Sequence, residues 1–102
     1  MSTLHTVNKS SFTHNTLKSC IAICANSDGI LLLEDGVFGA LQSAPDAEAL
    51  ISLNKKGGVI YALLDDLKAR ALEHKIASHI QLADYEEFVS LTLHHNCIHS
   101  WY

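Results

Sequence analysis

Two cysteines one helical turn apart carry the most reactive groups in this sequence. Cys20 and Cys24 lie in the segment LKSCIAIC at 17–24. A cysteine thiolate can attack a disulfide or a persulfide, and so move electrons or sulfur. That chemistry needs a lowered thiol pKa, which a helix N-terminus or a nearby cation supplies. Cys20 falls well inside the predicted helix and in its apolar stripe, so its position favours a buried structural cysteine. Cys24 lies deeper in the helix on the same stripe, and its position favours a structural role even more strongly.

The spacing of this pair also bears on redox chemistry. A disulfide between Cys20 and Cys24 is not expected, because bridging one turn of a helix strains the bond. A thiol redox protein normally carries Cys-x-x-Cys at a helix N-terminus, whereas the spacing here is Cys-x-x-x-Cys inside a helix. A freestanding thiol redox protein is therefore the disfavoured alternative.

The last residues hold a second group of reactive side chains. The segment HHNCIH contains His94, His95, Cys97 and His99, and both imidazole and thiolate are zinc ligands. Structural zinc sites usually combine two closely spaced pairs of ligands, and the sequence shows no second pair of cysteines or histidines to complete this one. We interpret the segment as a polar, histidine-rich tail and expect no metal and no organic cofactor. A homo-oligomer that binds metal through this tail is the other alternative.

The elements that must position these groups alternate between strands and helices. Short apolar runs predict strands at 3–7, 30–33, 59–63 and 80–83. Helices are predicted from about 15 to 24, 37 to 41, 47 to 53 and 65 to 70, and from 85 to 92 after an Asp84 cap. This alternation is typical of an α/β fold with a mainly parallel sheet flanked by helices, here as a single domain over 1–102.

Composition limits the classes of function. Of the 102 residues, 48% are hydrophobic, which is more than a small monomer buries easily and therefore predicts an oligomer. A net charge of -4 argues against direct binding of nucleic acid. The longest apolar runs have six residues against about 20 for a membrane span. With no signal peptide visible and an odd number of cysteines, a cytoplasmic protein is expected.

Several short sequence segments, taken in order, resemble those of one family over nearly the whole chain. These segments are LHTVNKSSF at 4–12, LLLEDGVFGAL at 31–41, YALLDDLKARAL at 61–72 and DYEEFVSLT at 84–92, with a Trp near the end. Together they are similar to the TusB/DsrH family, and the stretch 42–58 matches least. The resemblance implies a small three-layer DsrE-like, flavodoxin-like fold.

The resemblance also implies a function in sulfur transfer. Members are one of three homologous subunits of a heterohexameric relay, TusBCD or DsrEFH, which passes persulfide sulfur between proteins. The implied partners are the TusC/DsrF and TusD/DsrE subunits, with TusA and TusE or DsrC as relay proteins. Sulfur then goes to tRNA wobble-uridine 2-thiolation or to cytoplasmic sulfur oxidation.

The same resemblance assigns roles to particular residues. The principal sulfur-carrying cysteine lies on the TusD or DsrE subunit, so this chain is expected to lack the main catalytic cysteine. A cysteine in the first helix is a DsrH-like feature, which makes Cys20 a candidate secondary sulfur acceptor. Aromatic residues near the C-terminus, Tyr85, Phe88, Trp101 and Tyr102, are expected at subunit interfaces, with core packing as the alternative for Phe88.

Overall fold

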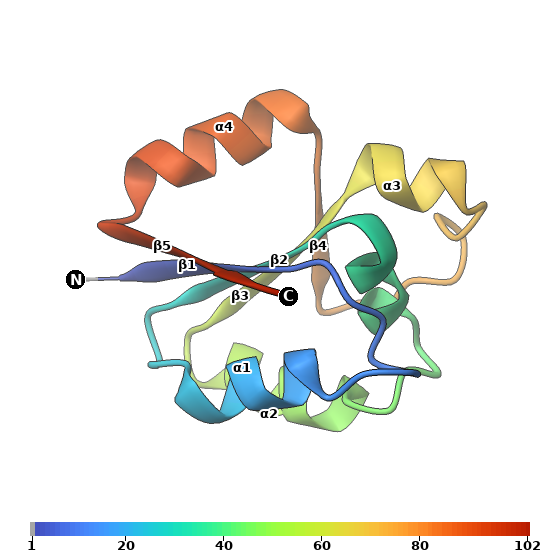
Figure 1. The fold of residues 1–102 in the computed structure, drawn as a ribbon, viewed down its shortest axis with the longest axis horizontal. Helices are drawn as coiled ribbons and strands as arrows, with labels where there is room; N and C mark the ends of the chain where they lie inside the picture. Colours follow the sequence, from blue (N-terminus) through green and yellow to red (C-terminus); the bar gives the residue numbers. More distant parts are fainter. Residues whose placement is uncertain (1) are drawn as a thin grey trace.

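Five strands form one sheet in which every neighbouring pair runs parallel. The computed structural model describes residues 2–102, and its strands are β1 (Thr3–Val7), β2 (Gly29–Leu32), β3 (Val59–Leu63), β4 (Ile80–Ala83) and β5 (Cys97–Trp101). Their order across the sheet is β4-β3-β2-β1-β5 (Figure 1). Strands β2, β3 and β4 add in sequence on one side of β1, and the chain then returns to place β5 on the other side.

The helices cover both faces of this sheet. They are α1 (Thr16–Ile23), the 3-10 helix η1 (Glu34–Ala40), α2 (Ala47–Lys55), α3 (Leu64–Ala69) and α4 (Tyr85–His94). In Figure 1, α1 and α2 lie on one face and α4 on the opposite face. The predicted three-layer α/β fold with a parallel sheet is confirmed. None of the helices within residues 2–102 is long and apolar enough to cross a membrane.

The core explains why β2 is an unbroken apolar run. All four residues of β2 are buried, since the strand lies in the middle of a sheet covered on both sides. Ile30 and Leu32 belong to the larger apolar cluster, which also contains Leu17 of α1 and Leu50 of α2. Leu31 belongs to a smaller cluster beneath α4. The strand predicted at 30–33 is therefore confirmed, with its bounds moved one residue earlier.

Two predicted helix starts have different outcomes. Asp84 caps α4 as expected, because its Oδ1 accepts a hydrogen bond from the Glu87 backbone N–H at 2.8 Å in a capping box. The helix predicted at 37–41 instead begins at Glu34, with Leu33 between it and the end of β2, and is a 3-10 helix. Glu34 has a positive φ of 51° and donates its backbone N–H to Asp66 Oδ2 at 2.6 Å. This long-range bond supports a strained residue that a local pattern does not reveal.

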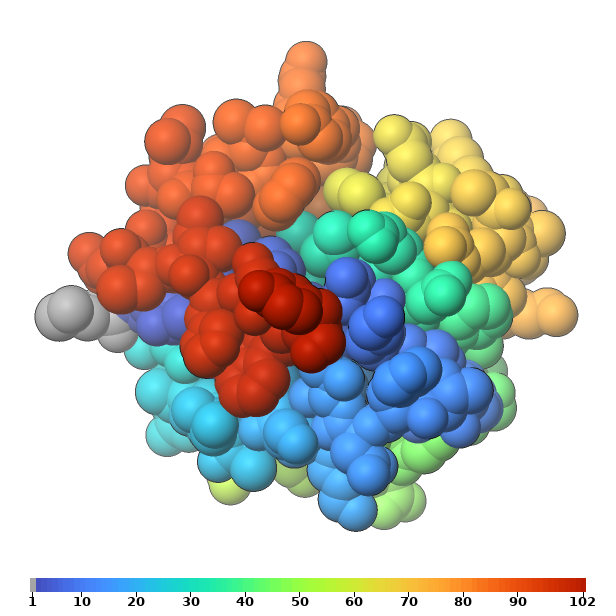
Figure 2. Space-filling model, viewed as in Figure 1, coloured from blue at the N-terminus to red at the C-terminus, as the bar shows by residue number. Residues whose placement is uncertain are grey.

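The C-terminal segment is a strand and not the polar tail that its composition indicates. β5 pairs with the outer edge of β1, and the register places His99 beside His5 and Trp101 beside Val7. Most of β5 is exposed, so the apolar alternation that signals a strand is weak. In Figure 2 this segment lies at the surface, against the N-terminal part of the chain.

Candidate functional site

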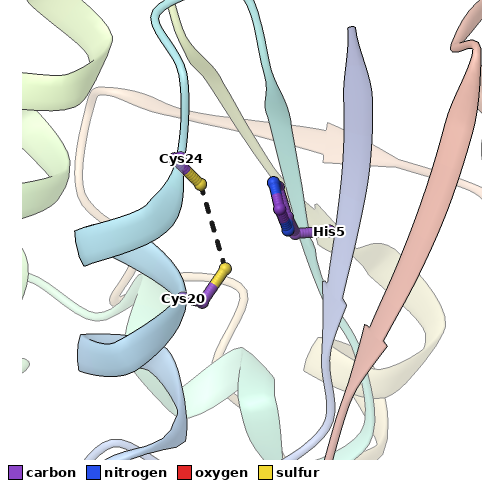
Figure 3. Close-up of side chains that lie close together, drawn as sticks. All are labelled: His5, Cys20 and Cys24. Carbon is purple, nitrogen blue, oxygen red and sulfur yellow. Dashed lines mark hydrogen bonds between the residues drawn. The ribbon is translucent and has the colours of Figure 1, made fainter.

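A histidine and two cysteines meet between β1 and α1. His5 projects from β1 toward α1, where Cys20 and Cys24 face it (Figure 3). Their ligating atoms all lie within 4.8 Å of one another. The two sulfur atoms are 3.9 Å apart, within reach of a weak S–H···S hydrogen bond. All three cysteines of the chain are free thiols.

The fold gives the two cysteines different surroundings. Cys20 lies on the inner face of α1 beside Leu17 and is fully buried. Cys24 follows the last helical residue as the C-cap and turns to an extended backbone conformation (φ -58°, ψ 133°). It is half-buried and lines a groove of about 370 Å³ between α1 and α2, together with Ser52 and Lys56. Of this pair, Cys24 is therefore the thiol that reagents can reach.

The thiol pair ionises unevenly. The pKa of Cys20 is raised, first by its hydrogen bond with Cys24 and then by burial and by the negative charges of Cys24 and Asp28. The pKa of Cys24 is lowered because the Cys20 thiol donates to its sulfur, which outweighs burial and the charge of Asp28. The first thiolate to form in this pair therefore belongs to Cys24. Sequence reasoning gave Cys24 no function, since it placed that residue inside the helix.

His5 is held from both sides by a buried chain of hydrogen bonds. Trp101 Nε1 donates to His5 Nδ1 at 3.0 Å, and His5 Nε2 lies 2.9 Å from Asp28 Oδ2. An indole N–H is only a donor, so Nδ1 must carry a lone pair. The proton of the imidazole then sits on Nε2 and is donated to Asp28. This Trp101–His5–Asp28 chain orients the imidazole beside the two sulfurs.

Asp28 is the acceptor at the end of this chain. It lies in the NSDG turn before β2 and is 7% exposed. Its oxygens also accept the backbone N–H groups of Thr3 and Ala25, each at 3.0 Å. Burial raises the pKa of this carboxyl, but the hydrogen bonds from His5 and the two backbone amides lower it more, so the net shift is downward. Asp28 is therefore a buried carboxylate at neutral pH.

Among the residues that the structure describes, the histidines and the cysteine of the C-terminal segment, which were the alternative metal site, do not come together as a set of ligands. His95 Nδ1 pairs with Ser2 Oγ at 3.0 Å, while the ring of His99 stacks on Trp101 with centroids 4.5 Å apart. Cys97 is exposed at the start of β5. Within residues 2–102, the group of three ligands close enough to share an ion is the one built from His5, Cys20 and Cys24. The tail contributes Trp101 to that site through its contact with His5.

The four residues predicted at interfaces occupy different environments. Tyr85 and Tyr102 are 64% and 85% exposed, as docking residues require. Phe88 is half-buried against the smaller cluster. Trp101 packs partly against the larger cluster and holds His5, so it has a role within its own chain. Their part in an interface stays a prediction.

The cysteines should differ strongly in their rates of alkylation. Under native conditions iodoacetamide is expected to modify exposed Cys97 first and half-buried Cys24 next. Cys20 should be protected by at least about tenfold relative to Cys24 until the chain unfolds, because reaction requires both access and thiolate. Mass spectrometry of time-quenched peptides measures the three rates. Equal rates at Cys20 and Cys24 would contradict the arrangement described here.

Comparison with known proteins shows which family this chain resembles in sequence. A family model described as "DsrH like protein" matches residues 9–98. Protein TusB of Yersinia pestis (strain Pestoides F) is 36% identical over 98 residues, covering 96% of this chain and 99% of that protein. Protein TusB of Photorhabdus laumondii is 35% identical over 79 residues, covering 78% and 80% of the two chains.

Solved structures show the same fold. The ychN protein from E. coli superposes with a TM-score of 0.80 over 98% of this chain and 99% of that chain, at 13% identity. Protein Tm0979 from Thermotoga maritima matches with a TM-score of 0.63 over 91% and 92% of the two chains, at 26% identity. The first of these likenesses concerns the fold alone. The match over residues 9–98 and the near full-length likeness to TusB proteins show that the chain belongs to the TusB/DsrH family.

Proposed function

We propose that this chain is one subunit of a cytoplasmic, heterohexameric sulfur-relay complex that passes persulfide sulfur between proteins. The observation that carries the proposal is the family match over 9–98, with TusB relatives aligned over almost the whole chain. Its companions would be two homologous subunits, of the TusC/DsrF and TusD/DsrE types. The sulfur-carrying cysteine of the relay would lie mainly on the TusD/DsrE-type subunit.

Two destinations for the sulfur fit this subunit. One is 2-thiolation of the tRNA wobble uridine, reached through TusA and TusE. The other is sulfur oxidation with DsrC, which the DsrH-like cysteine at position 20 favours. In neither case would this chain bind nucleic acid directly, since its net charge is -4.

The outer face of α4 supports a docking role. Tyr85, Val89 and Leu93 recur every four residues along α4 and are 64%, 44% and 80% exposed. Residues four apart lie on one side of a helix, so these three form a continuous apolar stripe. Such a stripe costs solubility unless another chain covers it. We propose that a sister subunit covers the α4 stripe.

Charged substitutions on the α4 stripe should weaken assembly. The double variant Val89→Glu/Leu93→Glu is expected to reduce recovery of the complex at least about tenfold, because buried unpaired charges are costly in an interface. Co-expression with the two sister subunits, followed by gel filtration, measures that recovery. Ile23→Glu on α1, also 64% exposed, is the matched control and should assemble normally. A wild-type chain that remains a stable monomer in the presence of its sisters would contradict the proposed function.

The thiol pair could take part in transfer as a secondary acceptor. The Cys24 thiolate would attack the outer sulfur of a partner's persulfide, and the partner would leave as a thiolate. The Cys20 sulfur, 3.9 Å away, would then attack the outer sulfur carried by Cys24, and the proton of the Cys20 thiol would pass to the departing Cys24 sulfur. This order follows from access, since Cys24 lines a groove and Cys20 is enclosed.

Sulfur loading of the assembled complex tests this route. Mass spectrometry should find an additional sulfur atom on Cys20 or Cys24 after the complex receives persulfide sulfur. Cys24→Ser should abolish modification of Cys20, whereas Cys97→Ser should leave it unchanged. An unmodified pair beside a loaded sister subunit would remove both residues from the relay and restrict this chain to docking.

A further inference from the structure

We propose that His5, Cys20 and Cys24 form a zinc site, with two thiolates and one imidazole as ligands and a fourth position open toward the groove between α1 and α2. The inference does not rest on the sulfur-relay function. It concerns the chemistry of three side chains that α1 and β1 bring together (Figure 3).

The spacing of the ligands suits a tetrahedral ion. Zinc binds thiolate sulfur at about 2.3 Å, which places two tetrahedral thiolate ligands about 3.8 Å apart. Cys20 Sγ and Cys24 Sγ are already 3.9 Å apart, and one nitrogen of His5 lies within 4.8 Å of both. Because Cys24 ends its helix in an extended conformation, a small rotation there can close the remaining distance.

Charge explains why a divalent ion is favoured over a monovalent one. Two thiolates and a neutral imidazole carry a charge of -2, which Zn²⁺ neutralises and a monovalent ion does not. The site lies beside the Asp28 carboxylate, in surroundings where an unbalanced buried charge is costly. Thiolate and imidazole are also ligands that zinc prefers, while calcium and magnesium prefer oxygen.

The residues behind the ligands have the character of a supporting shell. In zinc sites the ligating histidine usually donates a hydrogen bond from its other ring N–H to a carboxylate or a carbonyl oxygen. His5 has such a partner in Asp28 at 2.9 Å, and Asp28 is itself fixed by two backbone N–H groups. Each His5 nitrogen has a partner now, so zinc would replace one of them, Trp101 on Nδ1 or Asp28 on Nε2. Keeping the Asp28 bond leaves Nδ1 for the metal.

The fourth position would face the groove that Cys24 lines. Three protein ligands leave tetrahedral zinc one position for water or another small ligand. Cys24 borders the 370 Å³ groove, which gives such a ligand a path to the ion. Binding also requires both thiols to lose their protons, so zinc affinity should rise with pH.

Cobalt serves as the spectroscopic probe for this site. The reduced full-length chain is titrated anaerobically with Co²⁺. We expect one ion per chain, with intense visible bands of tetrahedral geometry and a thiolate charge-transfer band in the near ultraviolet. Zn²⁺ should displace the cobalt and abolish both bands. Cys24→Ser should weaken Co²⁺ binding at least tenfold and reduce the charge-transfer intensity, and Cys20→Ser and His5→Gln should do the same.

Matched variants separate this cluster from the rest of the chain. Cys97→Ser and His74→Gln alter exposed residues of the same types outside the cluster and should leave the titration unchanged. Circular dichroism confirms that each variant is folded, and Cys24→Ser, at a half-buried helix end, is the one that the fold should tolerate best. Zinc should also protect Cys24 from alkylation in the wild-type chain.

Two results would overturn the zinc site. One is a wild-type chain that gives no thiolate–cobalt band, and the other is a band that keeps its full intensity and affinity in Cys24→Ser or disappears in Cys97→Ser. Neither result touches the relay proposal, which is tested by assembly with the sister subunits in the absence of added metal. Conversely, a chain that binds zinc but does not assemble with the sister subunits would support the zinc site and contradict the proposed function.

Discussion

Replacing Asp28 with alanine should lower the free energy of unfolding by about 3 kcal/mol. The carboxylate accepts hydrogen bonds from His5 Nε2 and from the backbone N–H groups of Thr3 and Ala25. Removing it leaves three donors without their acceptor at a buried position. The loss should be measurable by urea denaturation followed by Trp101 fluorescence, because Trp101 is bonded to His5 and so reports on this site.

A second aspartate provides the control for this variant. Asp65 is exposed in the first turn of α3, and Asp65→Ala should change the free energy of unfolding by no more than about 0.5 kcal/mol. Equal effects of Asp28→Ala and Asp65→Ala would show that the buried chain of hydrogen bonds contributes little. Asp28→Asn should fall between them, since the amide oxygen can still accept.

The same carboxylate predicts how stability depends on pH. The pKa of Asp28 is lower in the folded chain than in the unfolded one, so its contribution is complete above the unfolded pKa of about 3.9. That contribution is lost as the pH falls through the folded pKa, which lies below this value. Asp28→Ala should therefore flatten the acid limb of the stability curve below pH about 4, and leave its slope between pH about 5 and neutral pH unchanged. An acid limb identical to that of the wild type would assign the pH dependence to other groups.

Local patterns were sufficient for most of the scaffold. The run ILLL predicted the buried strand, the i, i+3, i+4 stripe predicted the inner face of α1, and Asp84 predicted a cap that the structure contains. Each of these signals depends on neighbours within one or two turns of chain. They also placed Cys20 correctly as a buried residue, since its stripe position set the face it occupies.

The site itself depends on contacts that no local pattern contains. His5 and Trp101 are separated by 96 residues and meet because β5 pairs with β1 in one particular register. Asp28 lies in the turn between α1 and β2, where no local pattern marks it, and its side chain reaches back to β1. One signal was available: alternation in the strand 3–7 puts His5 on the same face as Val7, and therefore toward the core. A polar side chain at such a position must be hydrogen-bonded to a buried partner, so the strand pattern identifies His5 as a candidate site residue.

Gly36→Ala should be the other severe substitution, with a loss of about 3 kcal/mol or more in the free energy of unfolding. A Cβ atom at Gly36 would lie 2.0 Å from the Val7 carbonyl oxygen and 2.9 Å from its carbon. Both atoms are backbone at the end of β1, so no side-chain rotation can relieve the clash. Thermal denaturation measures the loss. Gly29→Ala is the control, because its Cβ would meet only the His95 and Leu4 side chains, at 3.3 Å.

The consequence of this clash reaches beyond stability. Gly36 lets η1 pack directly on the carboxyl end of β1, where η1 also supplies Asp35 to an ion pair with Arg70 at 2.8 Å. Asp35 and Phe38 of η1 border a groove of about 480 Å³ at this edge of the sheet. Displacing η1 should therefore reshape the groove and loosen the Asp35–Arg70 pair. The thiol site is built from β1 and α1 and takes no residue from η1, so any folded Gly36→Ala chain should keep the wild-type order of cysteine alkylation. A changed order would mean that η1 and the thiol site are structurally linked.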